Sequence, residues 1–244
     1  MFGPDSLEGG LAALTELLSY DTGLRPAPMS IKLAIVEDQE LFRRLLVELC
    51  SKQFGYPVVA EAGSAADALE RVPPAAPDVL LLDLQLPDGD GLDVAEQLLN
   101  CMTGLRVLAL TSLHDEVTIH RIREIGIQGF VDKNAQSPNT LREAIETVAS
   151  GRVFYAEVVQ RVQQAMRCDP VAFAKVLSDR EQELLHLLGR GLSNEEAADQ
   201  MGLTAWTVHS HRRNIMKKLG VATQAELIRY ALRKGFVRPD AAQF

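Results

Sequence analysis

The chain has 244 residues, of which 47% are hydrophobic and 24% are charged, and its formal net charge is −8. This composition excludes a wholly disordered chain, and the length suits two domains of roughly 100–200 residues each. The sequence has no apolar run of 18 residues and no secretory signal pattern, so we expect a soluble intracellular protein with no membrane segment. The three cysteines are scattered, without a CxxC pair, which predicts buried free thiols in a reducing compartment. They are Cys50, Cys101 and Cys168.

The first 28 residues stand apart from the rest. Five leucines between Leu7 and Leu18 fit one amphipathic helix, which Arg25-Pro-Ala-Pro28 would end. Met29 directly precedes the first predicted strand. Three interpretations stay open: translation starts at Met29, the helix docks on a partner, or it docks on the domain that follows.

Residues 31–150 alternate between two patterns. Apolar, β-branched runs predict strands, and segments of helical period between them predict helices. The strands are expected at 31–36, 58–61, 79–82, 107–110 and 127–131, and the helices at about 39–54, 64–72, 92–102, 116–126 and 138–150. Five strands alternating with five helices predict an α/β fold, a doubly wound five-stranded parallel sheet.

Residues 152–176 lose this periodicity and predict a linker, with some helix as an option. Four helical segments follow, at about 179–189, 194–201, 205–218 and 224–234. Ser178 with Glu181, and Ser193 with Glu196, have the spacing of capping boxes. The chain therefore ends in a small all-α, four-helix domain.

Charge separates the two halves of the chain. Residues 31–150 carry 10 basic and 19 acidic side chains, whereas residues 151–244 carry 14 basic and 10 acidic ones. Within 204–238, eight Lys or Arg residues oppose Glu226 alone. This basic stripe indicates a nucleic-acid partner for the back half, although a basic helix is more often a solvated surface.

Carboxylates follow two of the predicted strands. Glu37 and Asp38 come after the first strand and Asp83 after the third, so all three should meet at the carboxyl edge of the sheet. Three crowded carboxylates stay ionised only beside a cation, and oxygen ligands with open water positions suit Mg²⁺. Thr111 and Lys133 end the fourth and fifth strands. Asp88, Asp90 and Asp93 lack the spacing of an EF-hand, so we expect a tight turn there and not a Ca²⁺ loop.

Four motifs lie at strand ends in this order: "IVEDQ", "DVLLLDLQLPDGDG", "LALTS" and "GFVDK". Together they resemble the receiver domain of bacterial response regulators. The resemblance covers about 31–150 and implies that Asp83 is the phosphoacceptor. It also implies a Mg²⁺ site, whose ligands would be Asp38, Asp83, the backbone carbonyl of Gln85 and, through water, Glu37. Thr111 and Lys133 would contact the phosphoryl group, and Phe130 would be the aromatic switch residue or, equally, plain core. This chain departs from many receivers in having Glu37 as the first acid and Asn134, not proline, after Lys133.

The segment from Asp179-Arg-Glu181 through "GLSNEEAA" and "TVHSHRRNIMKKLG" resembles the LuxR-type helix-turn-helix domain of NarL/FixJ response regulators. The resemblance covers about 177–235 and implies that the helix at 205–218 enters the DNA major groove. We expect His209 and Arg213 to contact the groove with Ser210 nearby, and Thr204, Arg212 and Lys217 to contact the DNA backbone. His209 replaces the usual lysine of the family. We expect Trp206 to pack against the domain rather than to stack on a base.

Oligomeric state is implied by the same resemblance. The family pairs through its last helix, so Leu227, Ile228 and Ala231 are candidates for a dimer seam, with the core as the alternative. A dimer matches an inverted-repeat site whose halves lie about 10 bp apart.

These features predict a two-component response regulator. A sensor histidine kinase would phosphorylate Asp83, and the protein would then dimerise and bind double-stranded promoter DNA, with no catalysis beyond its own phosphoryl transfer. The expected divisions are an extension at 1–28, a receiver at 29–151, a linker at 152–176, a DNA-binding domain at 177–238 and a tail at 239–244. One alternative is an aspartyl phosphohydrolase, which needs an acid where Gln85 stands; another is a protein-binding adaptor, which the basic stripe disfavours.

Overall fold

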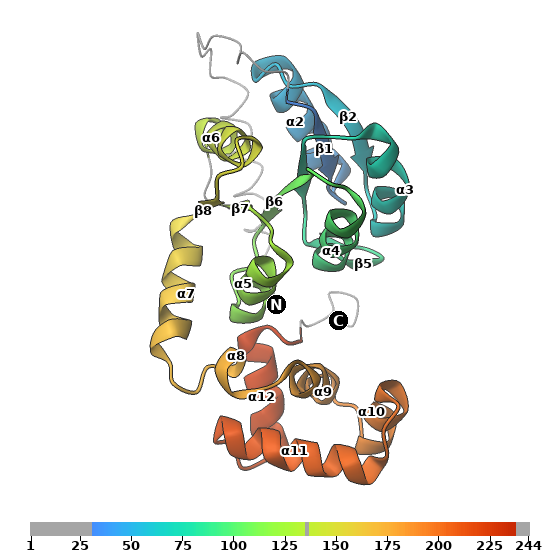
Figure 1. Ribbon diagram of the computed structural model, residues 1–244, viewed down its shortest axis with the longest axis vertical. Helices are drawn as coiled ribbons and strands as arrows, with labels where there is room; N and C mark the ends of the chain where they lie inside the picture. Colours follow the sequence, from blue (N-terminus) through green and yellow to red (C-terminus); the bar gives the residue numbers. More distant parts are fainter. Residues whose placement is uncertain (1–30, 135–136, 238–244) are drawn as a thin grey trace. The chain divides into compact units, whose positions relative to one another are not determined.

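The computed structural model describes residues 31–134 and 137–237, which form two compact units (Figure 1). The first unit is built from the residues up to Leu113 and from Arg121–Val159. The second is built from His114–His120 and from Gln160 onward. The extension predicted at 1–28 and the tail predicted at 239–244 lie outside the described residues.

A six-stranded parallel sheet forms the centre of the first unit, in the order β2-β1-β3-β6-β7-β8. Its strands are Leu33–Val36 (β1), Val58–Ala62 (β2), Val79–Leu82 (β3), Arg106–Thr111 (β6), Gly129–Asp132 (β7) and Phe154–Tyr155 (β8). Every residue of β1 and β3 is buried, because both faces of the sheet are covered. The chain order reverses at β1, which lies between β2 and β3, so the crevice for a ligand is at the carboxyl ends of β1 and β3.

Helices cover both faces of this sheet (Figure 1). The helices of the unit are α2 (Glu40–Glu48), which continues into the π-helical turn η1 (Leu49–Gln53), α3 (Ala65–Ala75), α4 (Gly91–Cys101), the second half of α5 (Glu116–Ile125) and α6 (Pro138–Ala149). α2, η1 and α6 share one apolar core with alternate residues of the central strands. α3 and α4 pack together on the other face, and Arg121 of α5 bonds Asp90 and Asp93 at the start of α4. The predicted doubly wound α/β fold is thus confirmed.

The sheet has one strand more than the sequence predicted. Phe154 and Tyr155 of β8 pair with Gly129 and Phe130 of β7, and the Tyr155 hydroxyl donates to the carbonyl of Ile127 at 2.8 Å. The segment 152–176, expected to be a linker, contains this strand and the helices α7 (Glu157–Cys168) and α8 (Phe173–Val176). A two-residue strand has no periodicity, so the sequence could not indicate it.

Four helices make up most of the second unit, as the sequence predicted: α9 (Asp179–Gly189), α10 (Asn194–Met201), α11 (Ala205–Leu219) and α12 (Gln224–Lys234). α9, α10 and α12 begin with complete capping boxes at Ser178, Ser193 and Thr223, and Thr204 caps α11. Gly202 ends α10 at a φ of 66°, a conformation that favours glycine and lets the chain turn within two residues into Thr204.

A short hairpin connects β3 to α4. Its strands are β4 (Gln85–Leu86) and β5 (Gly89–Asp90), which confirms the tight turn predicted there. The Asp88 carboxylate accepts hydrogen bonds from the first amides of α3, Ala65 N at 2.7 Å and Ala66 N at 3.0 Å, and these bonds lower its pKa. The acid is therefore a helix cap and not a calcium ligand.

The three cysteines are free thiols, but only one of them is buried. Cys50 belongs to η1 and lies in the core, where burial raises the pKa of its thiol to about 12. Cys101, the last residue of α4, and Cys168, the last residue of α7, are exposed. The prediction of buried thiols was wrong for these two, because each lies at the solvent-exposed end of a helix.

Gly91 gives a test of how closely α4 packs against the end of β3. A Cβ on Gly91 would lie 2.3 Å from the carbonyl oxygen of Asp83 and 2.6 Å from the Cα of Leu84, both rigid backbone atoms. We therefore expect Gly91→Ala to lower the free energy of unfolding by about 1–3 kcal/mol, the usual cost of overpacking. A Cβ on Gly89, two residues away, would lie no closer than 3.4 Å to any neighbouring atom. Gly89→Ala should therefore change the free energy of unfolding by no more than about 0.5 kcal/mol. Urea unfolding of both variants measures this, and equal effects would contradict the close packing.

Candidate functional site

Four charged side chains lie together at the carboxyl edge of the sheet. Glu37 and Asp38 directly follow β1, Asp83 directly follows β3, and Lys133 directly follows β7. One carboxylate oxygen from each of the three acids lies within 4.8 Å of the others. The Lys133 Nζ is 2.8 Å from Asp83 Oδ2 and 2.7 Å from Glu37 Oε2. The structure thus brings together the acids and the lysine that the sequence placed at separate strand ends.

Burial sets the electrostatics of this acidic cluster, by which we mean Glu37, Asp38 and Asp83. Glu37 and Asp83 are 1% and 3% exposed, whereas Asp38 is exposed. Burial raises the pKa of Glu37 to about 7, although Lys133 partly offsets it, and burial raises the pKa of Asp83 in the same way. Burial alone would lower the pKa of Lys133, but the two carboxylates outweigh it and raise that pKa. The ammonium therefore stays charged.

The remaining predicted residues surround this cluster. Thr111 is fully buried at the end of β6, where its hydroxyl accepts from Leu113 N and its carbonyl accepts from Lys133 N, both at 3.2 Å. The backbone N–H of Gln85 donates to Asp83 Oδ1 at 3.1 Å. Phe130 is fully buried in β7, opposite Ala109 of β6. Thr111 and Lys133 thus belong to adjacent strand ends, and Gln85 orients the Asp83 carboxylate.

Two residues of α2 contribute to the site without having been predicted. The Arg43 guanidinium donates to the backbone carbonyl of Glu37 at 2.5 Å and holds the turn between β1 and α2. The Phe42 ring centroid lies 5.0 Å from Lys133 Nζ, within the range of a cation–π contact. In the sequence both residues were only part of a helical period. Their contacts depend on the sheet order, which no local pattern contained.

The acidic cluster has the chemistry of a site for a divalent cation. Its ligands are all carboxylate oxygens, which hard cations prefer, and the exposed Asp38 leaves a path for water. When all four groups are ionised, the three acids and Lys133 carry an excess of two negative charges, which one divalent cation would neutralise. The observed residues therefore fit such an ion.

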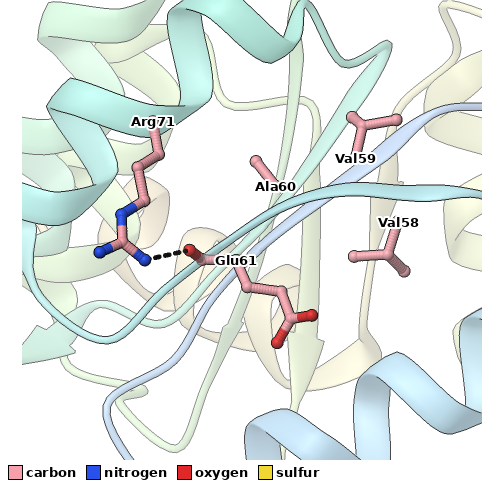
Figure 2. Close-up of a pocket in the computed structure, with 5 residues that line it drawn as sticks. All are labelled: Val58, Val59, Ala60, Glu61 and Arg71. Atoms are coloured by element: carbon pink, nitrogen blue, oxygen red, sulfur yellow. Dashed lines mark hydrogen bonds between the residues drawn. The ribbon is translucent and has the colours of Figure 1, made fainter.

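A surface hollow beside strand β2 is separate from this site (Figure 2). It is lined by Val58, Val59, Ala60, Glu61 and Arg71. Arg71 of α3 donates to the backbone carbonyl of Glu61 at 3.5 Å, so its guanidinium supports this edge of the sheet. No member of the acidic cluster lines the hollow.

The exposed face of α11 is the second candidate site. The exposed residues include Thr204 at its cap and His209, Ser210, Arg213 and Lys217, while Val208 and Ile215 are fully buried on the opposite side. Arg212, predicted to face outward, is half-buried, and its Nη1 donates to Asn194 Oδ1 of α10 at 3.3 Å. Lys218 is also engaged, since its Nζ lies 2.6 Å from Glu181 Oε2. The free basic side chains of the helix are thus fewer than the sequence suggested.

The structure contradicts one further prediction in the second unit and decides between two alternatives for another. Trp206, expected to pack, is 79% exposed. Leu227 and Ala231, named as candidates for a dimer seam, are 0% exposed within a single chain, because they belong to the core of the helical domain. A side chain that its own chain already covers cannot form a surface between copies. Of the three candidates only Ile228 is half-buried, and the neighbouring Leu232 is 41% exposed.

Comparisons with known proteins identify two family matches along the chain. Residues 33–146 match the family described as the response regulator receiver domain, and residues 175–231 match the luxR family of bacterial regulatory proteins. The transcriptional activator DevR/DosR of Mycobacterium tuberculosis is 36% identical over 216 residues, which span 86% of this chain and 97% of that protein. The response regulator VraR of Staphylococcus saprophyticus is 30% identical over 210 residues, spanning 86% of this chain and all of that protein.

Among solved structures, RcsB of Salmonella enterica serovar Typhimurium bound to promoter DNA has a TM-score of 0.58 at 23% identity. The match covers 83% of this chain and 98% of that one, and it supports the fold. In the described residues, no helix is both long and apolar enough to cross a membrane.

The raised pKa of Glu37 predicts a pH-dependent stability of the metal-free protein. Because the folded pKa is about 7 and the unfolded one about 4.5, the folded state keeps a proton that the unfolded state has lost, and stability falls as the pH rises between these values. Glu37→Gln removes this decline. In chelator, we expect the variant to gain up to about 3 kcal/mol over the wild type near pH 8 and little near pH 4.

Urea unfolding followed by circular dichroism across this pH range measures the difference. Glu61→Gln, which changes an exposed glutamate on β2, is the matched control and should run parallel to the wild type. A constant offset between Glu37→Gln and the wild type at every pH would contradict the assignment.

Proposed function

The chain belongs to the LuxR-type response regulators, and from this premise we propose that phosphorylation of Asp83 by a sensor histidine kinase controls dimerisation and binding to promoter DNA. The protein is a two-component response regulator with a receiver domain and a LuxR-type DNA-binding domain, and not a classical enzyme. The observation that carries the proposal is the position of Asp83, which is buried, bonded to Lys133 and grouped with two further acids. We propose that the protein acts in the cytoplasm, where its DNA lies.

Phosphoryl transfer in this proposal is a single in-line displacement. An oxygen of Asp83 attacks the phosphorus as the bond from phosphorus to the donor breaks, which leaves an acyl phosphate. Asp38, Asp83 and the carbonyl of Gln85, with Glu37 through water, would hold Mg²⁺. The ion, when bound, would supply positive charge that offsets repulsion between the carboxylate and the phosphoryl oxygens. Lys133 already donates a hydrogen bond to Asp83. After the transfer, its ammonium pairs with the new phosphoryl group.

The conformational signal begins with a change of charge. A phosphoryl group adds about −1.5 to −2 charges beside Lys133 and near the end of β6. Lys133, which bridges Asp83 and Glu37 in this structure, shifts toward the phosphoryl group. The Thr111 hydroxyl gives up its hydrogen bond from Leu113 N and donates to a phosphoryl oxygen instead. Phe130, buried in the adjacent strand, repacks into the space that Thr111 leaves.

The DNA-binding half of the proposal uses the exposed face of α11. His209, Ser210 and Arg213 contact the major groove, and Lys217 and Thr204 contact phosphates, as does Arg212 once it leaves Asn194. Two copies pair through the face of α12 that carries Ile228 and Leu232, which matches half-sites about 10 bp apart. The receiver begins at 29 and includes β8, the DNA-binding domain extends over 177–238, and the segment with α7 and α8 joins the two.

Asp83→Asn should stop phosphorylation by a small phosphodonor such as acetyl phosphate in Mg²⁺, because an amide cannot attack phosphorus in place of the carboxylate. The mass of the intact protein measures the gain of a phosphoryl group. Asp93→Asn, which changes an exposed acid outside the cluster, should be labelled like the wild type. Undiminished labelling of Asp83→Asn would sink the assignment of Asp83.

Arg213→Ala should weaken binding of the full chain to duplex DNA about tenfold, since it removes an exposed cation from the middle of α11. The slope of log affinity against log salt should fall by about one unit. Arg190→Ala removes an exposed cation at the end of α9 and serves as the matched control, with no expected change. Equal losses for the two variants would mean that α11 is not the DNA-contacting helix.

A further inference from the structure

Trp206 is the most exposed of the large hydrophobic side chains in residues 31–134 and 137–237. It is 79% exposed, whereas the others in this group range from 37% to 59%. A single exposed hydrophobic residue is common on proteins, so exposure alone assigns no role. The position of Trp206 in the fold does suggest a role. Trp206 is the second residue of α11, next to the helix start that Thr204 caps.

The Trp206 side chain lies on the face of α11 that is free to meet DNA. His209, Ser210 and Arg213 follow it at spacings of three, four and seven residues, which place all four on one stripe of a helix. All four are exposed. The buried face is on the other side of the helix and is occupied by Val208 and Ile215. The indole is therefore part of the same surface as the expected groove contacts.

We propose that Trp206 is a specificity-determining residue that contacts the C5 methyl group of a thymine in the major groove. The inference rests on the proposed DNA-binding function. In helix-turn-helix proteins the N-terminal residues of the recognition helix meet the base edges, and Trp206 lies in the first turn of α11.

The chemistry of the side chain selects this ligand. An indole has no charge and a single N–H donor, so it cannot replace a lysine or arginine on a phosphate. The thymine methyl is the apolar group that a base pair presents in the major groove, and apolar side chains read it by contact. Arg213 and Lys217 on the same exposed face supply the charge that attracts the DNA. This cationic setting favours a nucleic acid over an apolar protein partner as the occupant.

Deoxyuridine provides a test that removes only the methyl group. The full-length protein, treated with acetyl phosphate and Mg²⁺, first selects its preferred duplex from a randomised library. Each thymine of that duplex is then replaced in turn by deoxyuridine. At the contacted thymine the wild type should bind about fourfold more weakly, the loss expected for one buried methyl group. Trp206→Ala should bind the thymine duplex about tenfold more weakly and show no preference between the two bases there.

Two controls separate a specific contact from a general loss of binding. Trp206→Phe keeps an apolar ring and should retain most of the thymine preference. Trp206→Ala should leave the salt dependence of binding unchanged, because it removes no charge, unlike Arg213→Ala. Since Trp206 is mostly exposed, its replacement leaves the core of the helical domain intact.

Tryptophan fluorescence gives a second, direct readout, because the chain contains a single tryptophan. Acrylamide should quench it readily in the free protein and poorly in the complex with the selected duplex. If the wild type selects and binds DNA but its fluorescence stays fully quenchable, this inference alone is overturned. The same holds if the Trp206→Ala variant keeps the wild-type thymine preference. Protection from acrylamide at high protein concentration without DNA would show that a second chain covers the indole, which also overturns it. A wild type that selects no duplex overturns both this inference and the proposed function.

Discussion

The contact of one ammonium with two buried carboxylates is the interaction on which the acidic cluster depends. Lys133 lies within 2.8 Å of both Asp83 and Glu37, and neither acid is more than 3% exposed. Burial raises the pKa of both carboxyl groups and Lys133 only partly offsets this, whereas the two carboxylates raise the pKa of Lys133 and keep it charged. The parallel sheet makes the contact possible, since β1, β3 and β7 all end at the same edge. A change in the charge of Asp83 must therefore be felt by Lys133.

A similar ion pair holds two helices together within the second unit. The Glu181 carboxylate accepts from Ser178 N at the start of α9 and also pairs with Lys218 near the end of α11. Although burial opposes it, these bonds hold the pKa of Glu181 below its usual value. Lys218 thus fixes α11 against α9, while Arg213 and Lys217 remain exposed. The basic stripe divides into side chains that hold the fold and side chains left for a ligand.

Most of the fold could be predicted from the sequence, because its signals are local. Continuous apolar runs indicated β1 and β3, and Ser178 with Glu181 indicated the start of α9. The convergence of the acids followed from the rule that parallel strands end at one edge. What could not be predicted depends on contacts between distant residues. Such contacts decide that Lys218 is paired, that Leu227 is core and that Trp206 is exposed.

The uneven burial of the cysteines has a practical consequence for spectroscopy. Cys50 is shielded and its thiol has a pKa of about 12, so a maleimide reagent at neutral pH would leave it unmodified. Cys101 lies in the first compact unit and Cys168 in the second, and both are accessible to such a reagent. The native chain thus carries one attachment point for a dye or spin label in each unit, without an engineered residue. The distance between two such labels would measure how the units are arranged in solution.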